Sequence, residues 1–196
     1  MSARPPVEQF AEDIEFCPGF LSVAESDNYL QALSEQVVWR RDEVTLFGRT
    51  HPIPRLHQWY ADKGLSYTWS GLTMQPQPWF TELQNLRNAV APFAGEAFNS
   101  VLINLYRDGN DSMGWHSDDE AELGPAPVIA SVSLGAARDF QLRERGGVGK
   151  HTVQLTHGSL LVMRGATQSR WQHALPKRRR VVEPRINLTF RRIIAA

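Results

Sequence analysis

Val101-Leu102-Ile103-Asn104-Leu105-Tyr106-Arg107 is the first long stretch of the chain whose side chains follow a period of two. The apolar residues at positions 101, 103 and 105 share one face of an extended backbone, and Asn104 and Tyr106 share the other. This is the periodicity of a β-strand, whereas the apolar spacing before residue 100 is mainly that of helices. The second half of the chain is therefore expected to be built from strands.

Downstream segments repeat the pattern and are separated by turn residues. The further expected strands are Val128 to Leu134, Asp139 to Arg143, Thr152 to Leu155, Leu160 to Met163 and Arg185 to Arg191. The turns between them are Asp108-Gly109-Asn110, Gly146-Gly147, His157-Gly158 and Arg164-Gly165. A run of short strands of this kind predicts a β-sandwich or barrel.

Two helices are expected before these strands. Ser22-Val23-Ala24-Glu25 is a capping-box pattern that opens a helix ending near Trp39. The second helix is expected to start at Pro78 and to close at Pro92 and Gly95. Their apolar positions are Tyr29, Leu30, Leu33 and Val37 in the first, and Leu83, Leu86 and Val90 in the second. The predicted fold class is α+β, mainly β, with both helices packed outside the strands.

Shorter segments complete the expected organisation. Residues 1–20 form a lead-in with at most one short strand, and residues 21–196 form a single domain. Val44 to Arg49 is expected to be a strand running into a turn, and Tyr67 to Gly71 a short extended run.

Composition narrows the class of protein. With 42% hydrophobic and 21% charged residues, the chain resembles ordinary globular proteins, and no stretch reaches the roughly 18 apolar residues of a membrane span. Cys17 is the only cysteine, which excludes a disulfide framework or a cysteine zinc cluster, and the N-terminus lacks a secretory signal. We therefore expect a cytoplasmic protein without a membrane partner.

The net charge of zero conceals an asymmetry between the two parts of the chain. Residues 1–137 contain 8 Lys and Arg against 18 Asp and Glu, and residues 138–196 contain 13 against 3. Such a chain can present a basic face to an anion, unless the two parts interleave in space and their fields cancel.

Met113-Gly114-Trp115-His116-Ser117-Asp118-Asp119-Glu120 is the first candidate for chemistry. If this segment is extended, His116, Asp118 and Glu120 point to the same face. Together with His173, His116 and Asp118 would form the 2-His-1-carboxylate triad of non-haem Fe(II) oxygenases. The same ligands would also suit zinc, and an H-x-D pattern alone also occurs by chance.

The last expected strand has a polar face made of Arg185, Asn187, Thr189 and Arg191. An antiparallel sheet with one face on solvent would produce the same alternation. Two arginines flanking Asn and Thr, however, form a dense array of donors, which suits a dicarboxylate. A zinc hydrolase would need no such array, so the array favours iron over zinc.

These motifs together resemble the AlkB family of Fe(II)/2-oxoglutarate dioxygenases, in its DNA-repair branch. The resemblance covers roughly residues 40–193. Its motifs are Asn104-x-Tyr106, His116-x-Asp118, His173, Arg185-x-Asn187-x-Thr189-x-Arg191, Tyr67-Thr68-Trp69-Ser70-Gly71, Ser131-Val132-Ser133-Leu134-Gly135 and His157-Gly158-Ser159-Leu160-Leu161-Val162-Met163. One position departs from the pattern: Trp69, where Phe is more usual.

The resemblance implies a double-stranded β-helix (jelly-roll) core over about residues 100–193 and a nucleotide-recognition region over about residues 40–75. His116, Asp118 and His173 would hold Fe(II), with 2-oxoglutarate and dioxygen as cosubstrates. Arg185 would pair with the distal carboxylate of 2-oxoglutarate. The residues that would position the rest of the cosubstrate are Asn104, Tyr106, Asn187, Thr189 and Arg191.

The implied substrate is an N-alkylated base such as 1-methyladenine or 3-methylcytosine, flipped out of DNA, with RNA as a further candidate. Tyr67 and Trp69 would stack on the base, Glu120 would read its edge, and Phe47 would act as a wedge. The candidate contacts to the backbone phosphates are Arg49, Arg55, Lys177, Arg178, Arg179 and Arg180. Each also has a plainer interpretation, as a core aromatic, a solvated acid or a solvated basic loop.

The sequence thus predicts a monomeric demethylase of DNA. Two alternatives stay open: the same oxygenase chemistry on a protein or small molecule, and a nucleic-acid binding module with a non-catalytic metal site. His51, His57, His151 and His157 are expected to be structural or surface histidines.

Overall fold

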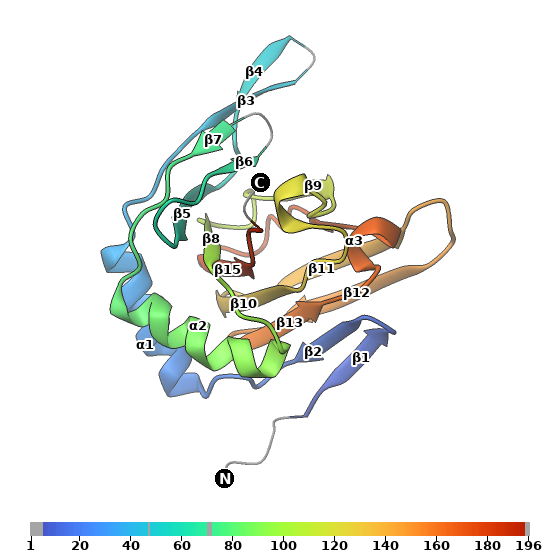
Figure 1. Ribbon diagram of the computed structural model, residues 1–196, viewed down its shortest axis with the longest axis horizontal. Coiled ribbons are helices and arrows are strands. Elements are labelled where there is room, and N and C mark those ends of the chain that lie inside the picture. The colour runs from blue at the N-terminus through green and yellow to red at the C-terminus, as the bar shows by residue number, and fades with distance from the viewer. Residues whose placement is uncertain (1–5, 47, 70–71, 195–196) are drawn as a thin grey trace.

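The computed structural model describes residues 6–46, 48–69 and 72–194 (Figure 1). Two antiparallel sheets face each other, and the two long helices cover the outer face of the larger sheet. The larger sheet has the order β1(Glu8–Ala11), β2(Ile14–Cys17), β13(Ser159–Met163), β10(Ile129–Gly135), β15(Arg185–Arg191), β8(Ser100–Tyr106) and β5(Leu56–Ala61). The smaller sheet has the order β12(Lys150–Leu155), β11(Arg138–Glu144), β14(Trp171–Leu175) and β9(Met113–His116).

The remaining elements lie outside the two sheets. Helix α1 spans Val23–Gln36, α2 spans Thr81–Ala94, α3 spans Thr167–Arg170, and a 3-10 turn spans Ala121–Leu123. Two hairpins, β3(Glu43–Leu46) with β4(Arg49–Pro52) and β6(Tyr67–Trp69) with β7(Leu72–Met74), project together at one end of the molecule (Figure 1). In the part of the chain that the structure describes, none of the helices has the length and apolarity that a membrane span needs.

The period of two in the sequence sorts side chains into two cores. The apolar residues of β15, Ile186, Leu188 and Phe190, pack beneath the helices together with Leu33 and Leu86. The opposite faces of the strands point into the space between the sheets, where a second apolar cluster lies toward the β2 side. This arrangement confirms the predicted mainly β jelly roll with its helices outside.

The polar face of β15 lies in that same space and not in solvent. Arg185, Asn187, Thr189 and Arg191 are all at most 8% exposed. Their strand lies between β10 and β8, with Asn187 opposite Asn104. The solvent-face interpretation of this alternation is therefore wrong.

Helix boundaries differ from the expectation in three places. The capping box is present, since Ser22 and Glu25 satisfy each other's backbone N–H groups, but α1 ends at Gln36. Helix α2 begins at Thr81, after Pro78, and it contains Pro92. Proline at position 92 removes one backbone donor near the end of the helix, and the helix then stops at Gly95, whose φ of 69° is left-handed.

Residues 1–20 do more than lead into the fold. They contain two strands instead of at most one, and β2 pairs with β13 inside the larger sheet. Ile14 and Cys17 are fully buried in the core. The pairing of β2 with β13, far away in the chain, is a contact that no local sequence pattern could predict.

Candidate active site

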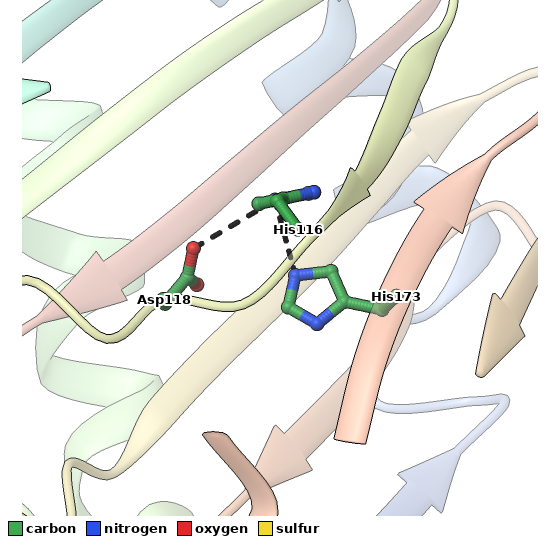
Figure 2. Close-up of side chains that lie close together, drawn as sticks. All are labelled: His116, Asp118 and His173. Atoms are coloured by element: carbon green, nitrogen blue, oxygen red, sulfur yellow. Dashed lines mark hydrogen bonds and ion pairs between the residues drawn. The ribbon is translucent and has the colours of Figure 1, made fainter. Parts of the chain in front are cut away.

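The three predicted ligands converge at the inner face of the smaller sheet (Figure 2). His116 ends β9 and lies opposite His173 in the register with β14, while Asp118 follows two residues after the strand. The two Nε2 atoms are 3.1 Å apart, and Nε2 of His116 is 3.8 Å from Oδ1 of Asp118. One donor atom from each of the three residues lies within 4.8 Å of the others.

Hydrogen bonding shows which atom of His116 is free to bind a ligand. Its Nδ1 lies 2.9 Å from the carbonyl oxygen of Gly114. Because a carbonyl can only accept, Nδ1 must carry the proton and Nε2 must present its lone pair. That lone pair faces His173 and Asp118, so the donor set fits a bound metal cation.

The electrostatic environment keeps the other two ligands in their metal-binding forms. Burial alone would raise the pKa of the Asp118 carboxyl, but Arg191, at 2.9 Å, and the two histidines lower it to about 2. Burial and the neighbouring His116 lower the pKa of His173 to about 3. An anionic carboxylate and a neutral imidazole are the states that coordinate a metal.

A pocket opens beside the triad, between the two sheets. Its lining combines apolar side chains with a polar wall along β8 and β15. The residues lining it are Leu102, Asn104, Tyr106, Met113, His116, Asp118, Ser131, Phe140, Leu155, Met163, His173, Leu175, Arg185, Asn187, Thr189 and Arg191. It thus contains the three ligands and the six residues predicted to bind the cosubstrate.

Arg185 is a buried cation that lines this pocket. It is 2% exposed, and burial lowers its pKa to about 10. One of its Nη atoms donates to Ser133 Oγ at 2.9 Å, and its guanidinium lies 5.2 Å from the Tyr106 ring centroid. Among the described residues it forms no ion pair with a carboxylate. A buried guanidinium without a carboxylate partner suits the carboxylate of a ligand.

The neighbouring polar residues are tied to one another. Asn187 Nδ2 donates to Ser131 Oγ at 2.7 Å, and Thr189 Oγ1 donates to Asn187 Oδ1 at 3.2 Å. Asn104 accepts a hydrogen bond of 2.8 Å from Arg55 Nε. These bonds hold the wall in place before a ligand binds.

Two arginines make contacts that the sequence did not predict, and for Arg55 the predicted role needs correction. Arg55 is 3% exposed and donates to Asn104, so it cannot contact a phosphate at the surface and instead supports the pocket wall. Arg191 lines the pocket and also forms an ion pair with Asp118, a predicted metal ligand; its role toward the cosubstrate stays a prediction.

Glu120 does not share a strand face with the ligands. Strand β9 ends at His116, and Glu120 precedes the 3-10 turn, where it is half-buried outside the pocket lining. The role of Glu120 in reading a base therefore stays a prediction, and the geometry that suggested it is wrong.

The predicted base and phosphate contacts on the two hairpins cannot be placed. Phe47 lies outside the described residues, and so do the side chains of Arg49, Tyr67 and Trp69, although the backbones of their strands are described. The hairpins themselves project at one end of the molecule, above β8 and β15 in Figure 1.

The basic segment 177–180 follows β14 and is largely exposed. Arg178 is partly engaged, since its guanidinium forms an ion pair of 2.8 Å with Asp139. Lys177, Arg179 and Arg180 are exposed. Three of the four cations thus face solvent close to the strand that carries His173.

Two of the other histidines, His57 and His157, take structural positions. His57 is buried with its Nε2 3.1 Å from Asp42. His157 accepts from the N–H of Gly135 and lies 3.1 Å from Asp27. Neither belongs to the pocket lining.

Sequence reasoning missed three residues around the site, of which Gln168 and Arg138 are buried and Phe140 is half-buried. Phe140 stacks on His173, with ring centroids 5.1 Å apart. Gln168 accepts from the backbone of Asp118, and Arg138 binds three backbone carbonyls. The sequence could have indicated Arg138 and Phe140, because they lie two residues apart at the start of the predicted strand 139–143 and so share a face. Gln168 could not be indicated in this way, because its helix is too short to show a period.

Comparison of the sequence with known protein families identifies the class of enzyme. The 2OG-Fe(II) oxygenase superfamily matches residues 13–191, and the chain belongs to it. The chain is therefore an Fe(II)- and 2-oxoglutarate-dependent dioxygenase, with dioxygen as the second cosubstrate. The triad and the buried Arg185 are consistent with that metal and that dicarboxylate.

Similar proteins place the chain in the AlkB family within this superfamily. The chain is 45% identical over 182 residues to human "DNA oxidative demethylase ALKBH2", covering 87% of this chain and 70% of that protein. The bovine protein of that name is 46% identical, with 87% and 66% covered. Human "Alpha-ketoglutarate-dependent dioxygenase alkB homolog 3" is 45% identical, with 90% and 64% covered. The chain thus spans about two thirds of the length of these relatives.

A solved structure shares the fold. "The structure of OsALKBH1" superposes with a TM-score of 0.65 at 17% identity, covering 95% of this chain and all of that one. At this sequence identity, the structural similarity supports the fold only.

Proposed function

We propose that this protein oxidatively demethylates N-alkylated bases in DNA, of the 1-methyladenine and 3-methylcytosine type. The observation that carries the proposal is the convergence of His116, Asp118 and His173 beside the buried Arg185. Relatives that are about 45% identical and are named DNA oxidative demethylases support the substrate class.

The proposed reaction consumes only the methylated base, dioxygen and 2-oxoglutarate. One oxygen atom of dioxygen enters the N-methyl group, and the resulting hydroxymethyl group leaves as formaldehyde and restores the base. The other oxygen atom enters 2-oxoglutarate, which loses carbon dioxide and becomes succinate. Bound iron would supply the activation of dioxygen that both oxidations require.

The chain's own residues contribute positioning and charge. Arg185 would pair with the distal carboxylate of 2-oxoglutarate, and Tyr106 and Asn104 would hold its remaining polar atoms. Arg191 keeps Asp118 ionised, and the apolar lining residues, among them Leu102, Leu155 and Leu175, would limit the entry of water into the pocket.

Access for the base would come from the end where the two hairpins project. A base inside a duplex cannot reach a buried site, so it must be flipped out. Tyr67 and Trp69 would stack on it, Phe47 would fill the gap it leaves, and the exposed cations of 177–180 would contact phosphates. Residues 40–75 would thus form the nucleotide-recognition region of a single domain over residues 21–196.

We further propose that the protein acts as a monomer in the cytoplasm and that RNA is a second substrate. The flipped base contacts proposed above involve no 2′-hydroxyl, so they do not by themselves discriminate DNA from RNA. Nucleic-acid length and strandedness can be varied in the same assay.

The test is release of formaldehyde and succinate from an oligonucleotide that contains 1-methyladenine, in the presence of Fe(II) and 2-oxoglutarate. Equal amounts of the two products are expected from the wild type. Asp118→Ala should release neither, because it removes a metal ligand, whereas a matched carboxylate change at the exposed Glu183, Glu183→Ala, should leave both unchanged.

The alternatives give different results in the same assay. Succinate without formaldehyde from the oligonucleotide would point to a protein or small-molecule substrate. No succinate at all, with nucleic-acid binding intact, would point to a binding module with a non-catalytic metal site.

A further inference from the structure

The carboxylate ligand lies on a segment that no sheet holds. Strand β9 ends at His116, and the next regular element is the 3-10 turn that begins at Ala121. Asp118 lies between them, yet it is 4% exposed, and its carboxylate lies within 4.8 Å of a ring nitrogen of each histidine. Some contact other than strand pairing must fix its backbone.

We infer that Gln168 is a positioning residue for Asp118, and through it for the metal. Oε1 of Gln168 accepts a hydrogen bond of 2.9 Å from the backbone N–H of Asp118, 50 residues away in the chain. Gln168 is 2% exposed, so water does not compete for this bond. Its Nε2 donates to Met163 Sδ at 3.6 Å, and Met163 lines the active-site pocket.

Gln168 is itself held by the N-terminal hairpin. It lies on α3, a helix of four residues that would not be stable alone. Asp13, in the turn between β1 and β2, anchors this helix: its Oδ2 accepts from Ala166 N–H at 3.1 Å, and its carbonyl accepts from Thr167 Oγ1 at 3.3 Å. The hairpin at the start of the chain thus sets the position of Gln168.

Neighbouring contacts restrain the residues on either side of Asp118. Ser117 Oγ donates to the carbonyl of Trp171 at 2.8 Å, and one Nη atom of Arg145 donates to Ser117 Oγ and to Asp119 Oδ2, both at 2.8 Å. The hydrogen bond to the backbone N–H of Asp118 itself comes from Gln168, and Arg191 forms an ion pair with the Asp118 carboxylate. Each contact therefore restrains a different part of the segment.

The consequence concerns metal affinity. A ligand that is free to swing leaves the geometry in which three protein atoms meet one ion, and removing a partner that orients a ligand typically weakens metal binding roughly 10- to 100-fold. The inference rests on the metal site of the proposed function, but it does not depend on the identity of the substrate.

The test compares two variants of the same short helix by titration with Co(II), followed by its visible absorption. Gln168→Met preserves the length of the side chain but removes the acceptor, and should raise the dissociation constant roughly tenfold or more and alter the Co(II) spectrum. Ser169→Ala removes an exposed hydrogen bond of 3.0 Å to the carbonyl of Ala166, within the same helix, and leaves the contacts of Gln168 and Asp13 in place. Its dissociation constant and spectrum should stay close to those of the wild type, even if its melting temperature falls.

Equal affinities for Gln168→Met and Ser169→Ala would overturn the inference. A second measurement needs no variant: in the metal-free wild type, hydrogen exchange at the Asp118 amide should be slow compared with that at the exposed Asp119. Fast exchange at Asp118 would also overturn it. Failure of the wild type to bind Co(II) would instead overturn the metal site itself.

Discussion

The burial of Arg185 is best explained by an anionic ligand that binds beside it. A guanidinium that is buried without a carboxylate partner is unfavourable, and its lowered pKa, about 10, expresses that cost. Among the described residues, its close contacts are with neutral groups, Ser133 and the ring of Tyr106. A dicarboxylate that entered the pocket would supply the missing charge.

Replacing this cation should weaken cosubstrate binding specifically. For Arg185→Gln we expect the KM for 2-oxoglutarate to rise roughly 10- to 150-fold, since a hydrogen bond to a charged group contributes about 1.5–3 kcal/mol. The value of kcat at saturating 2-oxoglutarate should change much less. Succinate formation measured against 2-oxoglutarate concentration checks this, and an unchanged KM would exclude Arg185 as the carboxylate partner.

Asp111 is a second buried charge, and it should make stability depend on pH. Burial raises its pKa, but hydrogen bonds from the Arg107 side chain, at 2.8 Å, and the Arg107 backbone N–H, at 2.9 Å, lower it overall. A carboxyl whose pKa is lower in the folded state stabilises the fold above its unfolded pKa, and that contribution disappears as the pH falls through the folded value.

Asp111→Asn should therefore lower the free energy of unfolding by about 1–3 kcal/mol at pH 7. The difference from the wild type should shrink as the pH falls below about 4. Urea unfolding of both proteins at a series of pH values checks this prediction. A difference that stays constant down to pH 2 would mean that the ion pair is not its source.

The polar faces of two strands could be predicted because their spacing is local, whereas the roles of their residues and of His173 were implied by the resemblance to the AlkB family. Asn104 and Tyr106, and the four polar residues from Arg185 to Arg191, each follow the period of one strand. The partners of these residues could not be predicted. That Arg55 bonds to Asn104 and Gln168 to Asp118 depends on segments about 50 residues apart, which no local pattern records.

At the scale of elements, the basic segment 177–180 is shaped by the loop after β8. Gly109 exchanges backbone hydrogen bonds with it: its N–H donates to the carbonyl of Val181 at 2.8 Å, and its carbonyl accepts from the N–H of Arg178 at 2.7 Å. A Cβ at position 109 would overlap the backbone carbonyl of Arg178. Only glycine allows the two loops to lie this close.

Gly109→Ala should therefore displace the basic segment and weaken nucleic-acid binding while Co(II) binding persists. The slope of the logarithm of affinity against the logarithm of salt concentration should fall by about one for each phosphate that the segment no longer binds. Gly19→Ala is the matched control, because a Cβ there meets nothing within 4 Å. An unchanged salt slope in Gly109→Ala would separate this segment from nucleic-acid binding.

The elements themselves were predicted unevenly. Strands that alternate over five residues or more, such as β8, β10 and β15, were recognised, and the capping box located the start of α1. The start of α2 was placed too early because Pro78 fits a first helical turn equally well in isolation. Residues 1–20 were expected to contain at most one strand, because the pairing of β2 with β1 and with the distant β13 leaves no local pattern in the sequence.

At the scale of the whole molecule, the charge asymmetry of the sequence is largely cancelled by the topology. Strand β15, from the basic end of the chain, lies between β10 and β8 from the acidic part. Ion pairs join the two parts, including Arg164 with Glu15 and Arg191 with Asp118. The basic character that remains exposed includes the segment 177–180, close to the active site.

The same topology assembles the metal site from the two ends of the β region. The register of β14 with β9 sets His173 opposite His116, and the register of β15 with β8 sets Arg185 opposite Tyr106. The site is thus a property of the closed jelly roll, and no single segment contains it.

A crystal structure of the protein with Mn(II) in place of iron and with 2-oxoglutarate tests this account most directly. We predict one metal ion bound by Nε2 of His116, Nε2 of His173 and a carboxylate oxygen of Asp118, with the distal carboxylate of 2-oxoglutarate paired to Arg185. A metal ion held by other residues, or a cosubstrate that leaves Arg185 without a partner, would contradict it.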